Sequence, residues 1–140
     1  MRVVLDTNIT ISGLLWRGAP RQVIEAARNG QIELFSCAEL LEELEDVLRR
    51  PKLAARLAQI GKEPSDLINA YLALLSVIRA PPLLAPVSVD PDDDVVLACA
   101  LAAQAAAIVS GDDDLLRVRM FQDMPILTAP ELLARLAPAV

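Results

Sequence analysis

The chain has 140 residues and a formal net charge of −6; 54% of its residues are hydrophobic and only 3% are aromatic. This length suits one domain, expected to span residues 1–140 around an aliphatic core. Charged residues interrupt every apolar stretch well before the roughly 20 residues of a membrane-spanning helix, and the apolar run after Arg2 is too short for a signal peptide. The two cysteines, Cys37 and Cys99, lack metal-type spacing and are typical of reduced, buried thiols, so we expect a cytoplasmic protein.

Short apolar runs alternate with helical patterns along the chain. Four runs predict buried strands, over 2–6, 32–35, 107–110 and 125–127. The helical patterns predict helices over 11–29 with a break at Gly18-Ala19-Pro20, 38–50 after a cap at Ser36, 52–60, 65–77, 93–106, 113–119 and 130–137. The proline-rich stretch 80–91 predicts a connector. Strands that alternate with helices indicate an α/β fold, a three-layer α/β/α sandwich with a central parallel sheet.

Acidic residues follow two of the predicted strands, where parallel α/β sheets form their sites. Asp6 ends the first strand and Asp112 comes just after the strand 107–110. Because the carboxyl ends of parallel strands meet at one edge of a sheet, these two carboxylates should lie close together. On the helix predicted over 38–50, Glu43 and Glu45 occupy opposite flanks of the apolar stripe, and the helical period alone leaves both open.

Two acidic runs open predicted helices. In Asp90-Pro91-Asp92-Asp93-Asp94, four acids within five residues exceed what capping of a helix requires, which makes Asp93 and Asp94 candidates for a pocket. In Gly111-Asp112-Asp113-Asp114, Asp112 is nearest the strand end, and Asp114 is a second candidate that could also cap the next helix.

Carboxylates gathered in one pocket repel one another unless protons or a cation occupy the pocket. The chain has no histidine and no cysteine cluster, so oxygen ligands must hold any metal ion, and such ligands favour Mg²⁺ or Mn²⁺. We expect at least one raised carboxylate pKa in the metal-free pocket. Thr7 and Asn8 are expected to orient the Asp6 carboxylate, or to form hydrogen bonds with loop amides, rather than to bind metal.

These motifs together resemble the PIN-domain nucleases and, more narrowly, the VapC-like toxins of toxin–antitoxin pairs. The resemblance runs nearly end to end and rests on Val4-Leu5-Asp6-Thr7-Asn8, Leu40-Leu41-Glu42-Glu43-Leu44, Asp90-Pro91-Asp92-Asp93-Asp94 and Val109-Ser110-Gly111-Asp112. It implies an endoribonuclease that depends on Mg²⁺ or Mn²⁺ and is usually held by a cognate antitoxin.

Carried over to this chain, the resemblance places the catalytic and metal-binding acids at Asp6, Glu43, Asp93 and Asp112. Asp94 and Asp114 remain secondary metal candidates, with the choice between Asp93 and Asp94 open by one residue. Ser110 matches the serine or threonine that precedes the last acid in the family, and we expect it to support the site together with Asn8. The main alternative is a catalytically inert PIN-like scaffold that binds a protein or RNA.

Basic and apolar surface residues predict the partners. An acidic protein is an unusual partner for RNA, but five of the thirteen basic residues fall between residues 49 and 62, where they form either a solvated helix face or a surface for RNA phosphates. The RNA-binding candidates are Arg17, Arg21, Arg49, Arg50 and Lys52. The helices around 38–78 carry more apolar residues than one sheet face should bury, which predicts a homodimer formed through residues 52–78. The resemblance agrees, since relatives in this family are often dimers.

Overall fold

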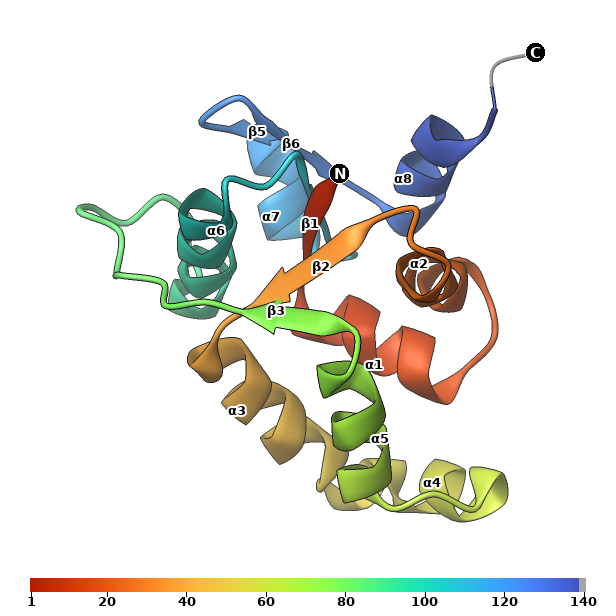
Figure 1. The fold of residues 1–140 in the computed structure, drawn as a ribbon. Helices are drawn as coiled ribbons and strands as arrows, with labels where there is room; N and C mark the ends of the chain where they lie inside the picture. The colour runs from red at the N-terminus through yellow and green to blue at the C-terminus, as the bar shows by residue number, and fades with distance from the viewer. Residues whose placement is uncertain (139–140) are drawn as a thin grey trace.

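A computed structural model describes residues 1–138 and shows a sheet with helices on both faces (Figure 1). The strands are β1 (Arg2–Leu5), β2 (Glu33–Ser36), β3 (Leu75–Val77), β4 (Ala107–Val109), β5 (Met120–Phe121) and β6 (Met124–Leu127). They form one sheet in the order β3-β2-β1-β4-β6-β5. Every neighbouring pair is parallel except the hairpin of β5 and β6, so the predicted α/β/α architecture is confirmed, with one antiparallel edge.

The helices follow the strands in the alternating order that the sequence predicts. They are α1 (Thr7–Leu15), α2 (Ala19–Arg28), α3 (Ala38–Leu48), α4 (Ala54–Ile60), α5 (Pro64–Leu72), α6 (Pro91–Ala103), α7 (Asp113–Val118) and α8 (Ala129–Leu136), with a 3₁₀ turn at Pro51–Leu53. None of the helices within residues 1–138 is long and apolar enough to cross a membrane.

The strands divide the core into two parts because alternate side chains point to opposite faces of the sheet. Val3 and Leu5 of β1 pack with residues of α1, α2 and α8 on one face. Val4, between them, packs with Ile108 of β4 and with residues of α6 and α7 on the other face. Figure 1 shows α3, α4 and α5 at one end of the sheet, below it in this view. The central strands β1 and β4 are therefore buried on both faces, and their ends are held in fixed positions.

The predicted break at Gly18-Ala19-Pro20 is confirmed: α1 and α2 are separated at Gly18, whose φ of 132° lies outside the region that other residues readily adopt. Three local predictions are wrong. The first helix was predicted to begin at residue 11 but begins at Thr7. Ser36 is the last residue of β2, and Cys37 takes the N-cap position of α3. The helix predicted over 65–77 ends at Leu72, and the chain then enters the edge strand β3.

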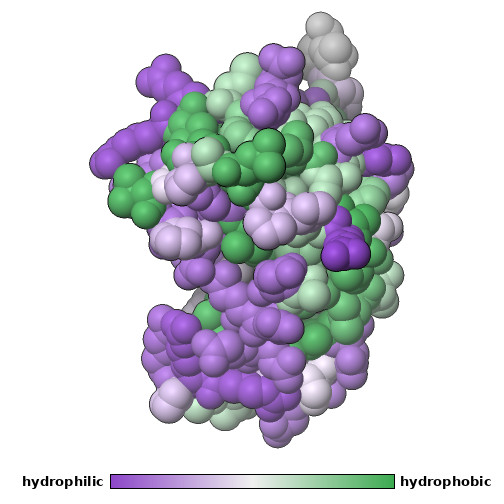
Figure 2. All heavy atoms as spheres, turned by 90° about the vertical axis from the view of Figure 1, so that its left-hand side faces the viewer, coloured by the Kyte–Doolittle hydropathy of each residue, from purple (hydrophilic) through white to green (hydrophobic). Residues whose placement is uncertain are grey.

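The apolar surplus predicted for residues 38–78 is mostly packed inside the molecule. Leu48, Leu57, Leu67 and Tyr71 are all buried, and the large apolar residues of this stretch that are exposed are Leu72, by 39%, and Val77, by 52%. Four other exposed apolar side chains belong to the connector between β3 and α6 and to α6 itself: Leu84, Val87, Val89 and Leu101. Figure 2 views the side of the molecule on which the connector and α6 lie; hydrophobic residues gather in its upper half, and hydrophilic residues dominate its lower half.

Candidate functional site

A small pocket of about 90 Å³ brings the predicted acids together at the carboxyl ends of β1 and β4. Its lining consists of Asp6, Thr7, Asn8, Glu43, Asp90, Asp92, Asp93, Val96 and Asp112. These residues come from four separate segments of the chain. Six of them are acidic, and among the described residues no lysine or arginine lines the pocket. The pocket is therefore a concentration of negative charge without a protein cation to balance it.

Asp6 lies at the point where β1 passes into α1, and its side chain is 5% exposed. As N-cap of α1, its Oδ1 accepts a hydrogen bond from the backbone N–H of Ile9 at 2.9 Å. Its Oδ2 accepts a hydrogen bond from the hydroxyl of Ser110. Burial raises the pKa of Asp6, against the lowering effect of these hydrogen bonds and with a smaller contribution from the charge of Asp112. The carboxylate is thus fixed in one orientation and partly desolvated.

Ser110 connects the two strand ends. While its hydroxyl donates to Asp6, the same oxygen accepts the backbone N–H of Asp112 at 3.0 Å. Ser110 is fully buried, because β1 and β4 pair directly through Leu5 and Val109. This single side chain therefore ties the orientation of one pocket acid to the backbone position of the other. Asp112 itself is the N-cap of α7, and its Oδ1 accepts the backbone N–H of Asp114 at 2.8 Å.

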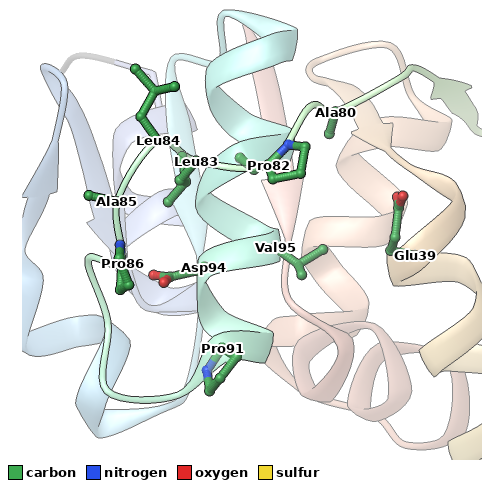
Figure 3. A pocket seen from close by; sticks show the side chains of 11 residues that line it. Glu39, Ala80, Pro82, Leu83, Leu84, Ala85, Pro86, Pro91, Asp94 and Val95 are labelled. Atoms are coloured by element: carbon green, nitrogen blue, oxygen red, sulfur yellow. The ribbon is translucent and has the colours of Figure 1, made fainter.

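The structure places Asp93 and Asp94 on different sides of α6. Asp93 lines the acidic pocket and is 7% exposed. Both carboxylate oxygens of Asp94 accept backbone N–H groups of the connector, from Val87 at 3.2 Å and from Ser88 at 2.7 Å. Figure 3 shows Asp94 pointing toward the connector, into a separate, largely apolar pocket of about 290 Å³. Asp94 therefore anchors the connector and does not contribute to the acidic pocket.

Glu43 and Glu45, which the helical period could not separate, also have different surroundings. Glu43 lines the acidic pocket, where burial raises its pKa most and the charge of Asp92 raises it further, while a hydrogen bond with Thr7 lowers it. Glu45 is 53% exposed and pairs with Arg49 at 3.2 Å along the surface of α3. The flank that carries Glu43 is the one that faces the pocket.

Among the pocket acids, Asp93 has the largest shift in pKa. Burial, followed by the charges of Asp112 and Asp90, raises its pKa to about 6, and a hydrogen bond from Ser88 opposes this. A raised carboxylate pKa is what the sequence predicts for a pocket that holds several acids and no cation. The pocket thus has the electrostatic properties of a cation site.

The donor atoms suit a hard divalent ion, because every acid in the lining offers carboxylate oxygens, the ligand type that Mg²⁺ and Mn²⁺ prefer. Within residues 1–138, no three acidic or cysteine side chains are already arranged as metal ligands would be. Binding would therefore require rotation of some side chains toward one another. The exposed or partly exposed acids of the pocket have room to do this: Glu43, Asp90, Asp92 and Asp112.

The remaining predicted residues lie around the pocket or away from it. Asn8 lines it, whereas Asp114 pairs with Arg117 at 3.2 Å on the surface of α7. Arg49 and Arg50 pair with acids one turn earlier on α3. The remaining basic candidates are exposed, and no ion pair within the described residues includes them: Arg17, Arg21 and Lys52.

Two acids of the pocket were not singled out from the sequence: Asp90 and Asp92. The run of acids before the helix was the available signal for both. Asp90 is the N-cap of α6, with its Oδ1 accepting the backbone N–H of Asp92 at 2.9 Å. Asp90 therefore both caps α6 and lines the pocket. Because capping alone explains an acid at this position, the sequence gives no separate reason to expect it in the pocket.

Comparison with known proteins identifies a family and similar folds. A family model described as "PIN domain" matches residues 2–114. The fold is similar to VapBC2 from Rickettsia felis, solved bound to a DNA fragment from its promoter, with a TM-score of 0.60, 15% identity, and coverage of 90% of this chain and 97% of that one. It is also similar to PAE2754 from Pyrobaculum aerophilum, with a TM-score of 0.60, 14% identity, and coverage of 97% and 95%. No curated protein matches the sequence.

The matched span contains all the acids of the pocket, from Asp6 to Asp112. It also contains β1 and β4, the two strands whose ends position those acids. The similar structures support the same fold over nearly the whole chain. The chain belongs to the PIN-domain family, whose members are nucleases.

Proposed function

We propose that the protein is a metal-dependent endoribonuclease whose active centre is formed by Asp6, Glu43, Asp93 and Asp112. The observation that carries the proposal is the convergence of these four acids, from four segments, in a pocket with no lysine or arginine in its described lining. PIN nucleases generally use divalent metal ions, and the oxygen donors here suit Mg²⁺ or Mn²⁺. Thr7, Asn8 and Ser110 would hold the acids in place.

Hydrolysis of a phosphodiester requires an activated water and relief of charge on the phosphate. A bound divalent ion supplies both by lowering the pKa of a coordinated water and by neutralising negative charge. The protein contributes a rigid frame: Asp6 is fixed by Ile9 and Ser110, and Ser110 also fixes the backbone of Asp112. The pKa of Asp93 is about 6 without the ion, and a bound cation would favour its charged form, in which it can hold the ion.

The proposal extends to the partners of the protein. We propose RNA as the substrate and a cognate antitoxin as the protein partner, so that the chain is the toxin of a toxin–antitoxin pair in the cytoplasm. The similarity of the fold to VapBC2 supports the second part. We also propose a homodimer formed through residues 52–78. Its support is the exposure of Leu72 and Val77 and the position of β3 at the edge of the sheet, where a second strand could pair. The continuous apolar stripe predicted from the sequence does not support it, because most of those residues are buried.

RNA cleavage tests the proposal. The purified protein should cut a single-stranded RNA in Mn²⁺ or Mg²⁺, and EDTA should abolish the cleavage. A DNA strand of the same sequence, run in parallel, should be cut more slowly. The protein is instead an inert scaffold if it cuts no RNA of a varied pool with either metal and yet binds a protein or RNA partner.

A further inference from the structure

Trp16, the only tryptophan of the chain, lies on the surface just after α1 and is 42% exposed. Tryptophan is large and is rarely buried completely, so this exposure alone does not indicate a function. Trp16 does not line the acidic pocket, and the proposed catalysis does not use it. Its surroundings carry the inference that follows.

Arg56 of α4 holds this tryptophan in place. The guanidinium carbon of Arg56 lies 5.6 Å from the centroid of the Trp16 ring, a cation–π contact. Arg56 is itself fixed, because its Nε donates to the backbone oxygen of Leu15 at 2.8 Å and its Nη1 donates to Gln59 at 3.3 Å. Helices α1 and α4 contact each other, as their neighbouring positions in Figure 1 illustrate. The indole is thus an ordered surface platform with a cation beside it.

The accessible side of α1 connects this platform to the acidic pocket. Asn8 lines the pocket, and Ser12, four residues further on, lies on the same face of α1. Trp16 is the C-cap of α1 and follows directly at the end of this helix, with extended backbone. Most of the other α1 side chains are buried, whereas Asn8 is exposed and Ser12 is partly exposed. Eight residues at a rise of about 1.5 Å place Trp16 about 12 Å from Asn8, or three to four nucleotides at a stacked spacing of about 3.4 Å.

Two arginines follow Trp16 in the chain: Arg17 is the next residue, and Arg21 lies in the first turn of α2. Both are exposed, and no carboxylate of residues 1–138 lies within ion-pair distance of either. Arg49 and Arg50, just after α3, are by contrast already paired with Glu45 and Asp46. Unpaired arginines together with an exposed, ordered aromatic ring are the combination found in grooves that bind single-stranded nucleic acid.

We propose that Trp16, backed by Arg56, stacks on a base of a single-stranded RNA whose scissile phosphate lies in the acidic pocket. Arg17 and Arg21 contact phosphates of the same strand. This inference rests on the proposed ribonuclease function and adds to it a base-binding subsite three to four nucleotides from the cut. The subsite favours strands long enough to reach from the pocket to the end of α1.

Fluorescence provides a test that does not depend on cleavage. In EDTA, a single-stranded RNA of 12 nucleotides, titrated into the full-length protein, should quench the fluorescence of Trp16. Trp16→Ala should weaken binding of this RNA about 5- to 150-fold, measured by anisotropy of a labelled strand, because the loss of one aromatic–base stack has this size. Trp16→Phe should retain part of the affinity. Met120→Ala, which removes another exposed apolar side chain, is the matched control and should bind like the wild type.

Strand length separates this inference from the proposed function. With Mn²⁺ present, Trp16→Ala should slow cleavage of the 12-nucleotide strand but not of a trinucleotide, which is too short to reach the subsite. Equal RNA affinity of Trp16→Ala and wild type would overturn the inference, even if both cut RNA. If Trp16→Ala binds RNA normally but loses a protein partner, Trp16 belongs to a protein interface and the inference is wrong. Quenching without cleavage would refute the proposed function alone.

Discussion

Two stretches of three consecutive aspartates open helices in this molecule, and the same sequence has different structural consequences in each. In Asp92-Asp93-Asp94 the middle residue is buried in the acidic pocket and the last one anchors the connector. In Asp112-Asp113-Asp114 the first residue faces the pocket, and the last pairs with Arg117 at the surface.

The difference follows from where each helix begins. The N-cap of α6 is Asp90, so Asp93 lies three residues into the helix; the N-cap of α7 is Asp112 itself. Each N-cap carboxylate accepts the backbone N–H two residues later, at 2.9 Å and 2.8 Å. The middle acid of the first triplet and the first acid of the second thus reach the pocket from different positions in their helices, and neighbouring acids in one triplet should differ sharply in function.

The largest expected difference is in catalysis. Asp93→Asn and Asp112→Asn should each lower the rate of RNA cleavage by at least about 100-fold, since even residues that only support metal ligands cost 10- to 100-fold when replaced. Asp94→Asn and Asp114→Asn should stay within a few-fold of wild type. Rates under single-turnover conditions with saturating Mn²⁺ measure this. Equal losses for both members of a triplet would contradict the assignment.

A smaller effect is expected on the pH dependence of stability. Because the pKa of Asp93 rises from 3.8 to about 6 on folding, the folded chain binds more protons than the unfolded chain between these values. The free energy of unfolding should therefore fall as pH rises through this window. Asp93→Asn should flatten the dependence and, in metal-free buffer at pH 7, raise the free energy of unfolding by on the order of 1 kcal/mol.

Urea unfolding across this pH range measures the effect, with Asp113→Asn, an exposed acid of the second triplet, as control. Asp113→Asn should leave the wild-type slope in place. If Asp93→Asn is instead less stable than wild type at pH 7, Asp93 has a structural role, and burial and repulsion among the pocket carboxylates do not destabilise the metal-free protein.

The smallest effects should distinguish the last acids of the two triplets. Asp94→Ala removes the acceptor of two connector N–H groups and should cost about 1 kcal/mol of stability. Asp114→Ala removes an exposed ion pair, in which both side chains are about half exposed or more, and should cost about 0.5 kcal/mol or less. Thermal unfolding of both variants tests the order. A larger loss for Asp114→Ala would show that Asp94 does not anchor the connector.

Much of the candidate pocket could be predicted because two of its acids come after apolar strands. Asp6 directly follows β1, Asp112 comes three residues after the end of β4, and a parallel sheet brings such strand ends together. Asp93 and Asp94 could not be separated, because that choice depends on a helix start at Asp90 that the acidic run does not reveal. Glu43 was preferred over Glu45 only through the family resemblance, since both flank the same apolar stripe.

The missed elements of the fold have local causes. The run from Leu72 to Val77 continues a helical apolar pattern, and only pairing with β2 makes its last three residues a strand. The hairpin of β5 and β6 turns at Gln122 and Asp123, both with positive φ, without the glycine that usually marks such turns. Tertiary pairing decided both cases, and the sequence pattern alone carried no signal for it.

Binding of Mn²⁺ tests the central claim most directly. Isothermal titration of the wild type should show binding that is at least about tenfold weaker in Asp93→Asn and in Asp112→Asn. Asp94→Asn and Asp114→Asn, which keep the same net charge as those variants, should bind like the wild type. Absence of binding by the wild type, or equal weakening in all four variants, would contradict the assignment of the acidic pocket as a metal-dependent catalytic centre.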